Sequence, residues 1–432
     1  MRIAVIGSGI SGLASAYWLS RGHQVTLYEA SDYLGGHTHT HLVEQDGQRY
    51  AVDTGFIVYN PANYPLFTWF LHELGVGTQP TSMSFSVQNA ASGLEYSATS
   101  LDTLFCQRRN LASPRFLGML RNLRRFYREA QTLLEQPEPG PSLGDYLAEK
   151  RYGAAFRDDH LVPMAAALWS SPAERILAFP VRFLVRFMAN HQMLQVAGRP
   201  QWRVVRGGSS SYIRALRKNW TVRERLSCPV LSVSRKYDHV VVTTRDNQDP
   251  YDQIVLACHS DQALRLLEDA SQTERDILGA MTYQANDVVL HTDSTMLPGN
   301  RKAWAAWNAY VPVGSNPCCT VSYCMNILQG LRSRRPFIVT LNRTEDVDPS
   351  EVLARMAYQH PVYTAQSVAA QARKHEISGH RHTWYAGAYW GWGFHEDGMR
   401  SALDVVRGLG CAPDRWASDV SGSTSMPLVS AA

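Results

Sequence analysis

Residues 2–12 read RIAVIGSGISG and decide the fold of this chain. The apolar run from Arg2 to Ile6 is typical of a buried parallel strand, and the glycine-rich segment after it leads into a helix predicted over residues 13–21. A second strand is predicted over residues 24–28 and ends at the acidic Glu29. Strand, glycine turn, helix, strand and terminal acid in this order predict a Rossmann-like α/β domain that binds a dinucleotide.

The glycines and the acid have separate physical roles. Gly7 permits a tight turn, Gly9 lets the backbone approach a diphosphate, and Gly12 allows the helix to pack against the strand. The helix N-terminus offers N–H groups and a partial positive charge to the diphosphate, and Glu29 can accept hydrogen bonds from both ribose hydroxyls. We therefore predict that the ADP half of the dinucleotide is bound by Gly7, Ser8, Gly9, Ile10, Ser11, Gly12, Glu29 and Ala30.

Length and composition favour a large, folded protein. The chain has 432 residues, of which 45% are apolar and 19% charged, enough for two intertwined domains. Gly7 ends the first apolar run too early for a signal peptide or a membrane span, so we expect a cytoplasmic protein. The seven cysteines lack close, even spacing and form no C-x-x-C pair, which favours reduced thiols and no structural zinc. A net charge of +4 gives no argument for nucleic acid as a partner.

The remaining sequence alternates between helical and β-rich stretches. Helices with basic residues are predicted over about 115–194, and strands over 228–244 and 251–257, separated by turn-forming residues 245–250. The proline-rich segment 136–141 is predicted as a loop, and a last helix is expected to begin near Met399.

A second glycine pair helps to distinguish an FAD-binding chain from an NAD-binding one, since both share the first motif. Residues 35–40 read GGHTHT. With the first motif, this segment resembles the extended FAD signature of the amine oxidase, phytoene desaturase and protoporphyrinogen oxidase superfamily. Relatives usually carry Arg after the glycine pair, where this chain has His37, and a neutral imidazole holds phosphate less strongly. His37, His39 and His41 would share one face of an extended strand, but without Cys or acidic companions we expect no metal site.

Further motifs of the same superfamily follow in order. They are VDTGFI at 52–57, VRGGSSS at 205–211, CPV at 228–230, TWYAGA at 383–388 and EDGMRS at 396–401. In relatives the valine of the third motif meets adenine, and the last helix directs its N-terminus at the flavin C2 carbonyl, where reduced flavin carries negative charge. The acid that relatives have after the closing Ala-Gly is Ala388 here. The resemblance adds to the predicted cofactor residues Gly36, His37, Thr38, Gly55, Phe56, Ile57, Val230, Gly387, Asp397, Gly398 and Met399.

The resemblance implies a Rossmann-like FAD-binding domain interleaved with an α+β substrate domain. We expect the FAD-binding parts at 1–80, 205–265 and 359–432, the last with the closing helix. The substrate parts are expected at 81–204, which is helical, and at 266–358. Covalent attachment in relatives needs a residue near the flavin's dimethylbenzene edge, and no Cys occurs between His360 and Trp384, so non-covalent FAD is expected.

Two aromatic groups indicate the substrate site without choosing the substrate. One comprises Tyr385, Tyr389, Trp390, Trp392 and Phe394, and the other Trp304, Trp307 and Tyr310. Aromatic faces suit an amine, and aromatic walls also suit a lipid tunnel. Any single one of these side chains could equally be an ordinary core residue.

Shorter strings point to one branch of the superfamily. GFIVYN at 55–60, WAAWN at 304–308, HPVY at 360–363 and YWGWGFHED at 389–397 resemble bacterial flavoproteins that accompany cyclopropane-fatty-acid-synthase-like methyltransferases. That resemblance implies an oxidoreductase that desaturates methyl-branched or unsaturated fatty-acyl chains, free or within phospholipid. A flavin amine oxidase and a non-catalytic FAD-holding protein remain alternatives. The sequence does not indicate the electron acceptor or the oligomeric state.

Desaturation requires loss of a hydride and of a proton from neighbouring carbons, so a base is needed in front of the flavin. The segment before the last helix offers His395 and Glu396. We predict His395 as proton acceptor and Phe394 and Trp392 as residues that position the chain. Glu396 is equally suited to cap the helix, and His395 could merely pack.

Basic helices suggest one further contact. Residues 115–128 contain five arginines and an apolar stripe of Phe116, Leu120, Leu123 and Tyr127, and residues 178–188 combine apolar side chains with arginines. Such helices can lie on the inner, anionic face of a membrane, although they are often solvated faces of a globular domain.

Overall fold

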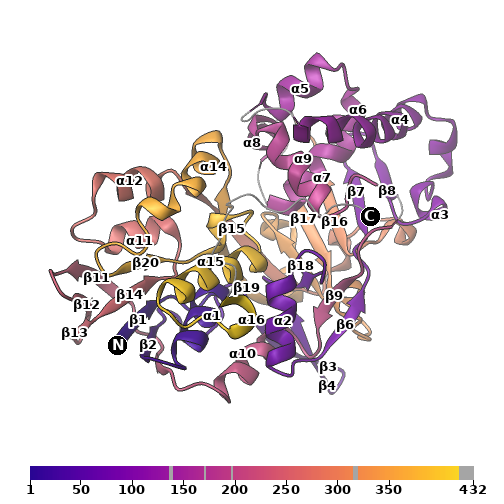
Figure 1. The fold of residues 1–432 in the computed structure, drawn as a ribbon. Helices are drawn as coiled ribbons and strands as arrows, with labels where there is room; N and C mark the ends of the chain where they lie inside the picture. The colour runs from indigo at the N-terminus through magenta and orange to yellow at the C-terminus, as the bar shows by residue number, and fades with distance from the viewer. Residues whose placement is uncertain (136–139, 170–171, 196–197, 315–319, 418–432) are drawn as a thin grey trace.

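The computed structural model describes residues 1–135, 140–169, 172–195, 198–314 and 320–417 (Figure 1). Most of the predicted loop at 136–141 lies outside these residues, as do Cys318 and Cys319. Within them, Cys106, Cys228, Cys258, Cys324 and Cys411 are free thiols.

A five-stranded parallel sheet begins the fold and unites three distant parts of the chain. Its strands, in spatial order, are β10 (Arg223–Arg225), β2 (Gln24–Tyr28), β1 (Arg2–Ile6), β14 (Gln253–Leu256) and β20 (Thr383–Tyr385). β1 and β2 have the predicted bounds. Helix α1 (Ile10–Leu19) begins three residues earlier than predicted, because Gly9 is already its extended N-terminal cap.

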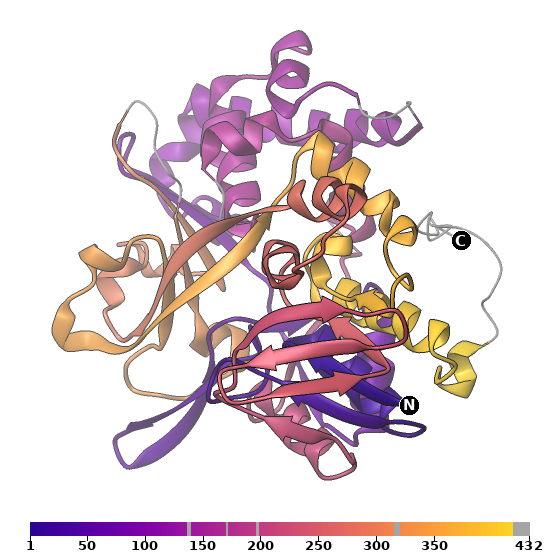
Figure 2. The ribbon, with the colours of Figure 1, turned by 90° about the vertical axis from the view of Figure 1, so that its left-hand side faces the viewer.

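The two faces of this sheet are covered differently. Ile3 and Val5 of β1 pack on the side of α1 and α15 (His395–Gly408). Ala4 and Ile6 face the opposite way, onto an antiparallel meander of β11 (Val230–Arg235), β12 (Val240–Thr244) and β13 (Gln248–Tyr251), which lies over the sheet in Figure 2. The predicted turn at 245–250 is therefore too long. Pro250 fits in β13 because this strand is at the edge of its sheet.

A seven-stranded mixed sheet forms the second half of the molecule. Its spatial order is β19 (Val352–Val362), β15 (Thr282–His291), β18 (Ile338–Leu341), β17 (Thr320–Cys324), β16 (Trp307–Val311), β7 (Phe85–Asn89) and β8 (Leu94–Ser97). Neighbours are antiparallel except β16 and β7. The segment 81–204, predicted as helical, thus also contributes two strands.

Helices from the middle of the chain cover the β7 and β8 end of this sheet (Figure 1). They are α3 (Leu101–Leu104), α4 (Pro114–Glu129), α5 (Leu143–Glu149), α6 (Ala154–Phe156), α7 (Val162–Trp169), α8 (Ala173–Ala178) and α9 (Val181–Asn190). Their apolar faces share a core with Val87, Tyr96, Ala309 and Val311 of the sheet.

Smaller elements join the two halves. The strands are β3 (Thr40–Gln45), β4 (Gln48–Asp53), β5 (Val58–Tyr59), β6 (Thr78–Thr81) and β9 (Trp202–Val205). The helices are α2 (Pro65–Glu73), α10 (Ser210–Arg217), α11 (Ser260–Leu266), α12 (Gln272–Gly279), α13 (Met325–Gln329), α14 (Ala365–Ala372) and α16 (Asp414–Ala417).

The last helix, α15, begins at His395 and not near Met399. The Asp397 carboxylate accepts hydrogen bonds from the backbone N–H groups of Trp392 (3.1 Å) and Phe394 (3.0 Å), and so fixes the entry to the helix. His395 and Glu396 therefore lie in its first turn, whereas the sequence predicted them in the preceding loop.

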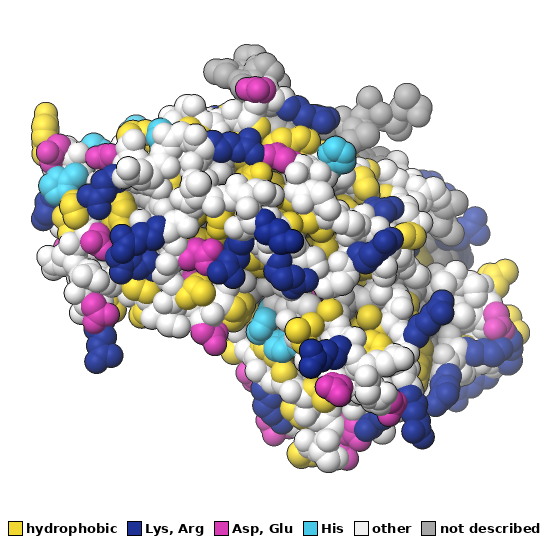
Figure 3. All heavy atoms as spheres, turned by 90° about the horizontal axis from the view of Figure 1, so that it is seen from below, with side chains coloured by type: hydrophobic (Ala, Val, Ile, Leu, Met, Phe, Trp, Pro, Cys, Tyr) yellow, Lys and Arg dark blue, Asp and Glu magenta, His cyan; other side chains and the backbone are white. Residues whose placement is uncertain are grey.

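In the described part of the chain, no helix is long and apolar enough to cross a membrane. On the face seen in Figure 3, Lys and Arg side chains are spread among acidic and uncharged ones.

Candidate functional site

A single large cavity runs between the two halves of the molecule. Its volume is about 1670 Å³, above the range of about 300–1,000 Å³ that is usual for one small-molecule site. One end is lined by the glycine turn after β1 and by Glu29, and the other by side chains of α4, α7 and α9. The cavity therefore has room for a cofactor and a second ligand.

The glycine turn presents its open side to this cavity. At Gly7 (φ +98°) an added Cβ would lie 2.9 Å from the Ala257 carbonyl oxygen, and at Gly12 it would lie 1.9 Å from the Gly7 carbonyl oxygen. At Gly9 an added Cβ would meet nothing within 4 Å. Gly7 and Gly12 thus serve backbone packing, while Gly9 borders open space where a diphosphate can approach α1, whose N-terminus has no side-chain cap.

Glu29 lies at the cavity wall just after β2. One carboxylate oxygen accepts from the Ser8 backbone N–H (2.9 Å) and the other from the Ser31 backbone N–H (2.9 Å). The Ser8 hydroxyl also donates to the first of these oxygens (2.5 Å), so only the oxygen that accepts from Ser31 keeps a lone pair for a ribose hydroxyl. Val230 lines the same end of the cavity.

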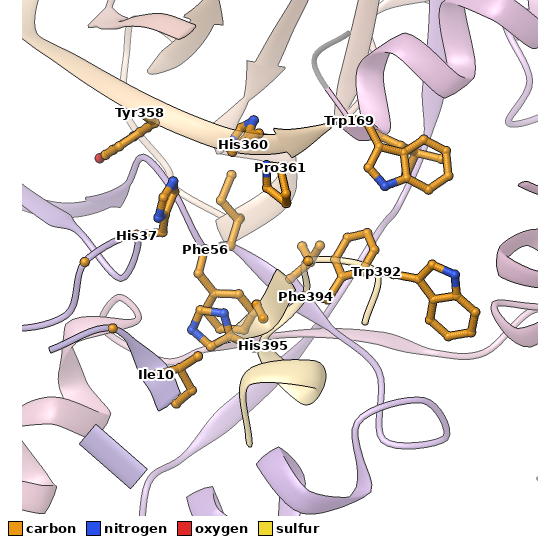
Figure 4. A pocket seen from close by; sticks show the side chains of 18 of the residues that line it. Ile10, His37, Phe56, Trp169, Tyr358, His360, Pro361, Trp392, Phe394 and His395 are labelled. Carbon is orange, nitrogen blue, oxygen red and sulfur yellow. The ribbon is translucent and has the colours of Figure 1, made fainter. Parts of the chain in front are cut away.

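His37 follows the second glycine pair and faces the cavity (Figure 4). An added Cβ at Gly36 would lie 3.2 Å from the Gly9 Cα, so the two glycine segments are in direct contact. The His37 Nε2 is buried without a hydrogen-bond partner among the described residues. Open space at Gly9 beside a buried, unpaired imidazole nitrogen fits the diphosphate of FAD.

Two histidines that the sequence did not single out lie near His37. Its ring centroid is 5.5 Å from that of His360 on β19 and 6.3 Å from that of His259 before α11. Burial first, and then the neighbouring His360 and His259, lower the pKa of His37 to about 3. His37 is therefore neutral at physiological pH.

The other histidines of the alternating segment lie elsewhere. His39 stacks on Tyr33 (ring centroids 4.3 Å apart) and lies against the tilted ring of His41 (4.1 Å), and neither His39 nor His41 lines the cavity. The predicted common face of His37, His39 and His41 is wrong, because only residues from Thr40 onward form strand β3. The described residues contain no group of three or more His, Cys, Asp or Glu placed to hold a metal.

His395 and Phe56 stack at the centre of the cavity, with ring centroids 3.4 Å apart (Figure 4). The His395 Nε2 lies 3.0 Å from the Thr38 hydroxyl and 3.3 Å from the Tyr212 hydroxyl. Burial, with a smaller effect of His37, holds the pKa of His395 well below its ordinary value. The ring is therefore neutral, and its Nδ1 has no hydrogen-bond partner in the described part of the chain.

Most predicted cofactor residues line this one cavity. They are Gly7, Ser8, Gly9, Ile10, Ser11, Glu29, Ala30, Gly36, His37, Gly55, Phe56, Ile57, Val230 and Gly387. The predicted residues that do not line it are Gly12, Thr38, Asp397, Gly398 and Met399.

The five outside the lining support those that face the cavity. Thr38 orients His395, and Asp397 holds the loop before α15. At Gly398 an added Cβ would lie 2.6 Å from an Ile10 side-chain carbon, so α15 packs closely on α1. Met399 is fully buried in the same core. Contact of these residues with the cofactor stays a prediction.

The predicted aromatic groups divide between the cavity and the core. Tyr389, Trp392, Phe394 and Trp307 line the cavity. The others do not: Tyr385 donates to Glu274, Trp304 donates to the Pro298 carbonyl, Tyr310 stacks with Arg343, and Trp390 lies near Lys374 and Tyr389.

Phe187 and Trp169 complete an aromatic wall that sequence reasoning missed. The Phe187 ring lies 5.3 Å from Phe394 and 6.0 Å from Trp392, and Trp169 lies 4.9 Å from Phe187. Both come from helices whose apolar faces look like ordinary core in the sequence. Only their packing against the loop before α15 reveals the wall.

Helix α4 also lines the cavity. Leu120, Leu123, Arg124 and Tyr127 are spaced as one helix face and all border it, while Phe116 packs in the helical core. The apolar stripe predicted for a membrane surface is therefore directed inward. The sequence shows the spacing of this helix face, but not which part of the protein the face contacts.

The sequence profile of the family described as flavin containing amine oxidoreductase matches residues 10–325. The chain belongs to this family. Membership implies a flavin cofactor, and the residues around Gly9, Glu29 and His37 fit one. An L-amino-acid oxidase from Pseudechis australis is 51% identical over 47 residues, which are 11% of this chain and 9% of that protein. The match thus spans far less than two thirds of that relative.

Solved structures show the fold of this flavin-dependent oxidoreductase over nearly its whole length. A CLA-producing fatty acid isomerase from P. acnes superposes with a TM-score of 0.66 at 15% identity, covering 94% of this chain and 97% of that one. Putrescine oxidase bound to putrescine superposes with a TM-score of 0.67 at 14% identity, covering 94% and 99%. At these identities the likeness establishes the fold alone.

Proposed function

We propose that this family member desaturates fatty-acyl chains, methyl-branched or unsaturated and free or within phospholipid, with non-covalently bound FAD. The charge of the cavity carries the proposal. Among its described lining residues the only acid is Glu29, at the nucleotide end. A protonated amine would find no counter-charge at the other end. An alkyl chain is stabilised there because its apolar surface is removed from water.

The aromatic wall would hold the chain in front of the flavin. Trp392, Phe394 and Phe187 come from two elements and meet at the cavity, beside the stacked Phe56 and His395 (Figure 4). A wall of rigid aromatic rings would restrict an alkyl chain to few orientations, which would align one C–H bond for transfer.

His395 would take the proton. When bound, FAD supplies the acceptor for the hydride that leaves the chain. The proton on the neighbouring carbon then needs a neutral base, and the His395 imidazole is neutral, with an Nδ1 that has no hydrogen-bond partner among the described residues. The Thr38 and Tyr212 hydroxyls hold Nε2 and so fix the ring orientation.

Amine oxidation is the second candidate. The family description and the names of relatives, such as L-amino-acid oxidase and putrescine oxidase, favour it. The fold is also that of a fatty acid isomerase, so the fold alone does not decide between an amine and an acyl substrate.

Anaerobic reduction of the flavin separates the two. The FAD-loaded protein is mixed with oleate, with phospholipid vesicles carrying oleoyl chains, and with putrescine and cyclohexylamine, and the flavin's visible absorbance is followed. Bleaching by an acyl compound, with none by the amines, supports the proposal. Bleaching by an amine alone would replace it with amine oxidation, and an unreduced flavin in every case would contradict both.

A further inference from the structure

Four polar side chains lie at the end of the cavity that is lined by α4 and α7, opposite the glycine turn. Arg124 and Tyr127 are one turn apart on α4 and both line the cavity, as do Arg199 and His160. Arg199 lies beside the Tyr127 hydroxyl and close enough to His160 for its charge to act on both groups. The rest of this end is apolar, with Leu120, Leu123, Met164 and Leu168 among its walls.

His160 is the most deeply buried member of the group. Its exposed fraction is 4%, and its Nδ1 lies 2.8 Å from the Tyr96 hydroxyl. Its Nε2 is buried and has no hydrogen-bond partner among the described residues, and the residue is one of those that line the cavity. Burial first, and then the charge of Arg199, lower the pKa of His160 to about 4, so the ring is neutral. Because the Tyr96 hydroxyl donates to the Asp159 carbonyl oxygen (2.9 Å), Nδ1 carries the ring proton and Nε2 is an acceptor, which suits a hydroxyl group of a ligand.

Arg124 is exposed at the cavity wall and forms no ion pair or hydrogen bond with the described residues. Arg199 donates to the Gln195 carbonyl (3.1 Å) and likewise has no acidic partner there. Because no carboxylate of the described residues lines this end, two guanidinium groups remain to bind an anion from outside.

We propose that Arg124, Arg199 and Tyr127, beside His160, form a site for the anionic head of a single-chain amphiphile, a carboxylate or a phosphate. This inference rests on the proposed acyl substrate and names its class: the chain is held by a charged head at one end while its tail passes the aromatic wall. The π- and α-helical segment from His160 to Trp169 spans roughly 13 Å at 1.5 Å per residue. That separation between head site and aromatic wall suits a long chain and exceeds a short diamine.

The test measures head-group preference by calorimetric titration of the FAD-loaded protein. The probes are oleate, oleoyl lysophosphatidate, methyl oleate and oleylamine, all below their aggregation concentrations. We expect both anionic probes to bind at least ten-fold more tightly than methyl oleate, and oleylamine more weakly. The tighter of the two anions identifies whether the head is a free carboxylate or a phosphate ester.

Variants then assign the preference to these side chains. In Arg124→Gln with Arg199→Gln, affinity for the anionic probes should fall about ten-fold for each arginine, with methyl oleate unchanged. Arg121→Gln is the matched control, since Arg121 is exposed on the same helix but does not line the cavity. Flavin absorbance and thermal unfolding confirm that each variant is folded and loaded.

The outcomes separate this inference from the function beneath it. Equal binding of oleate and methyl oleate, or an anion preference that survives in the double variant, would overturn the head site while leaving an acyl substrate in place. Failure of every long-chain probe to bind would overturn the acyl substrate as well.

Discussion

At the residue scale, Glu29 does two things at the end of β2. It accepts from the Ser8 and Ser31 backbone N–H groups and from the Ser8 hydroxyl, which fixes the turn, and it offers its remaining lone pair to the cavity. The first role is internal to the protein, and the second requires the ribose of the cofactor.

Glu29→Ala should therefore weaken FAD binding. Loss of a charge-assisted pair of hydrogen bonds corresponds to about 1.5–3 kcal/mol, or roughly ten- to hundred-fold in affinity. The purified variant should be largely colourless. Glu29→Gln, which keeps one acceptor oxygen but no charge, should retain intermediate occupancy. Full flavin occupancy in Glu29→Ala would be incompatible with the assigned role.

His395→Ala tests the proposed base. We expect FAD to be retained, because the nucleotide end of the cavity is untouched, while anaerobic reduction by an acyl substrate slows by about 10²–10⁴-fold. Tyr212→Phe is the comparison: it removes the hydroxyl 3.3 Å from Nε2 but leaves the ring in place, and should have a much smaller effect. Reduction of His395→Ala at the unaltered rate would remove His395 from the mechanism.

At the scale of elements, α15 and α2 are connected by a buried carboxylate. Glu396 in the first turn of α15 accepts from the backbone N–H groups of Leu66 (3.1 Å) and Phe67 (3.0 Å) at the start of α2. It thus caps a different helix from its own, which the sequence prediction of a local cap did not foresee. Burial raises the pKa of Glu396 from 4.5 to about 7.

The raised pKa predicts a pH-dependent stability. Between pH 4.5 and 7 the folded state binds more protons at Glu396 than the unfolded state, so stability from this group is present at lower pH and lost as pH rises. Relative to Glu396→Gln, the free energy of unfolding of the wild type should fall by up to about 3 kcal/mol as the pH rises across that window. Denaturant unfolding of both proteins at several pH values measures this difference. If the two plots of unfolding free energy against pH are parallel, Glu396 does not have a raised pKa.

Leu168→Trp tests α7 as a wall of the substrate path. Leu168 lines the apolar end of the cavity, and a larger ring there should weaken binding of a long chain by about 1–3 kcal/mol without loss of FAD. Leu117→Trp is the control, because Leu117 is 44% exposed on α4 and lies outside the cavity lining. Equal reduction by oleate in both variants would mean that the chain takes another path.

Local sequence predicted the elements whose geometry is local. Gly7, Gly9 and Gly12 act within one turn, so β1, α1 and their cofactor role were readable. His259, His360 and Phe187 enter the cavity from elements far apart in sequence, and no local pattern marks them. The start of α15 was misplaced for a related reason: Asp397, already inside the helix, holds the backbone of the loop before it.

At the scale of the whole molecule, the cavity between the parallel sheet and the helical layer connects the nucleotide end to the proposed substrate end. Its nucleotide end carries Glu29 and the glycine turn, its centre His395 and Phe56, and its far end apolar walls with arginines. A flavin in the first part would meet an acyl chain from the last part at the centre.

Mass spectrometry of the acyl chain after one anaerobic turnover tests this central claim most directly. FAD-loaded protein in excess over an acyl substrate is bleached, denatured and extracted. We expect an acyl chain that is lighter by two hydrogens, with one new double bond for each flavin reduced, and no such product in His395→Ala. An unchanged acyl chain, together with flavin reduction by an amine that yields its oxidised product, would contradict it.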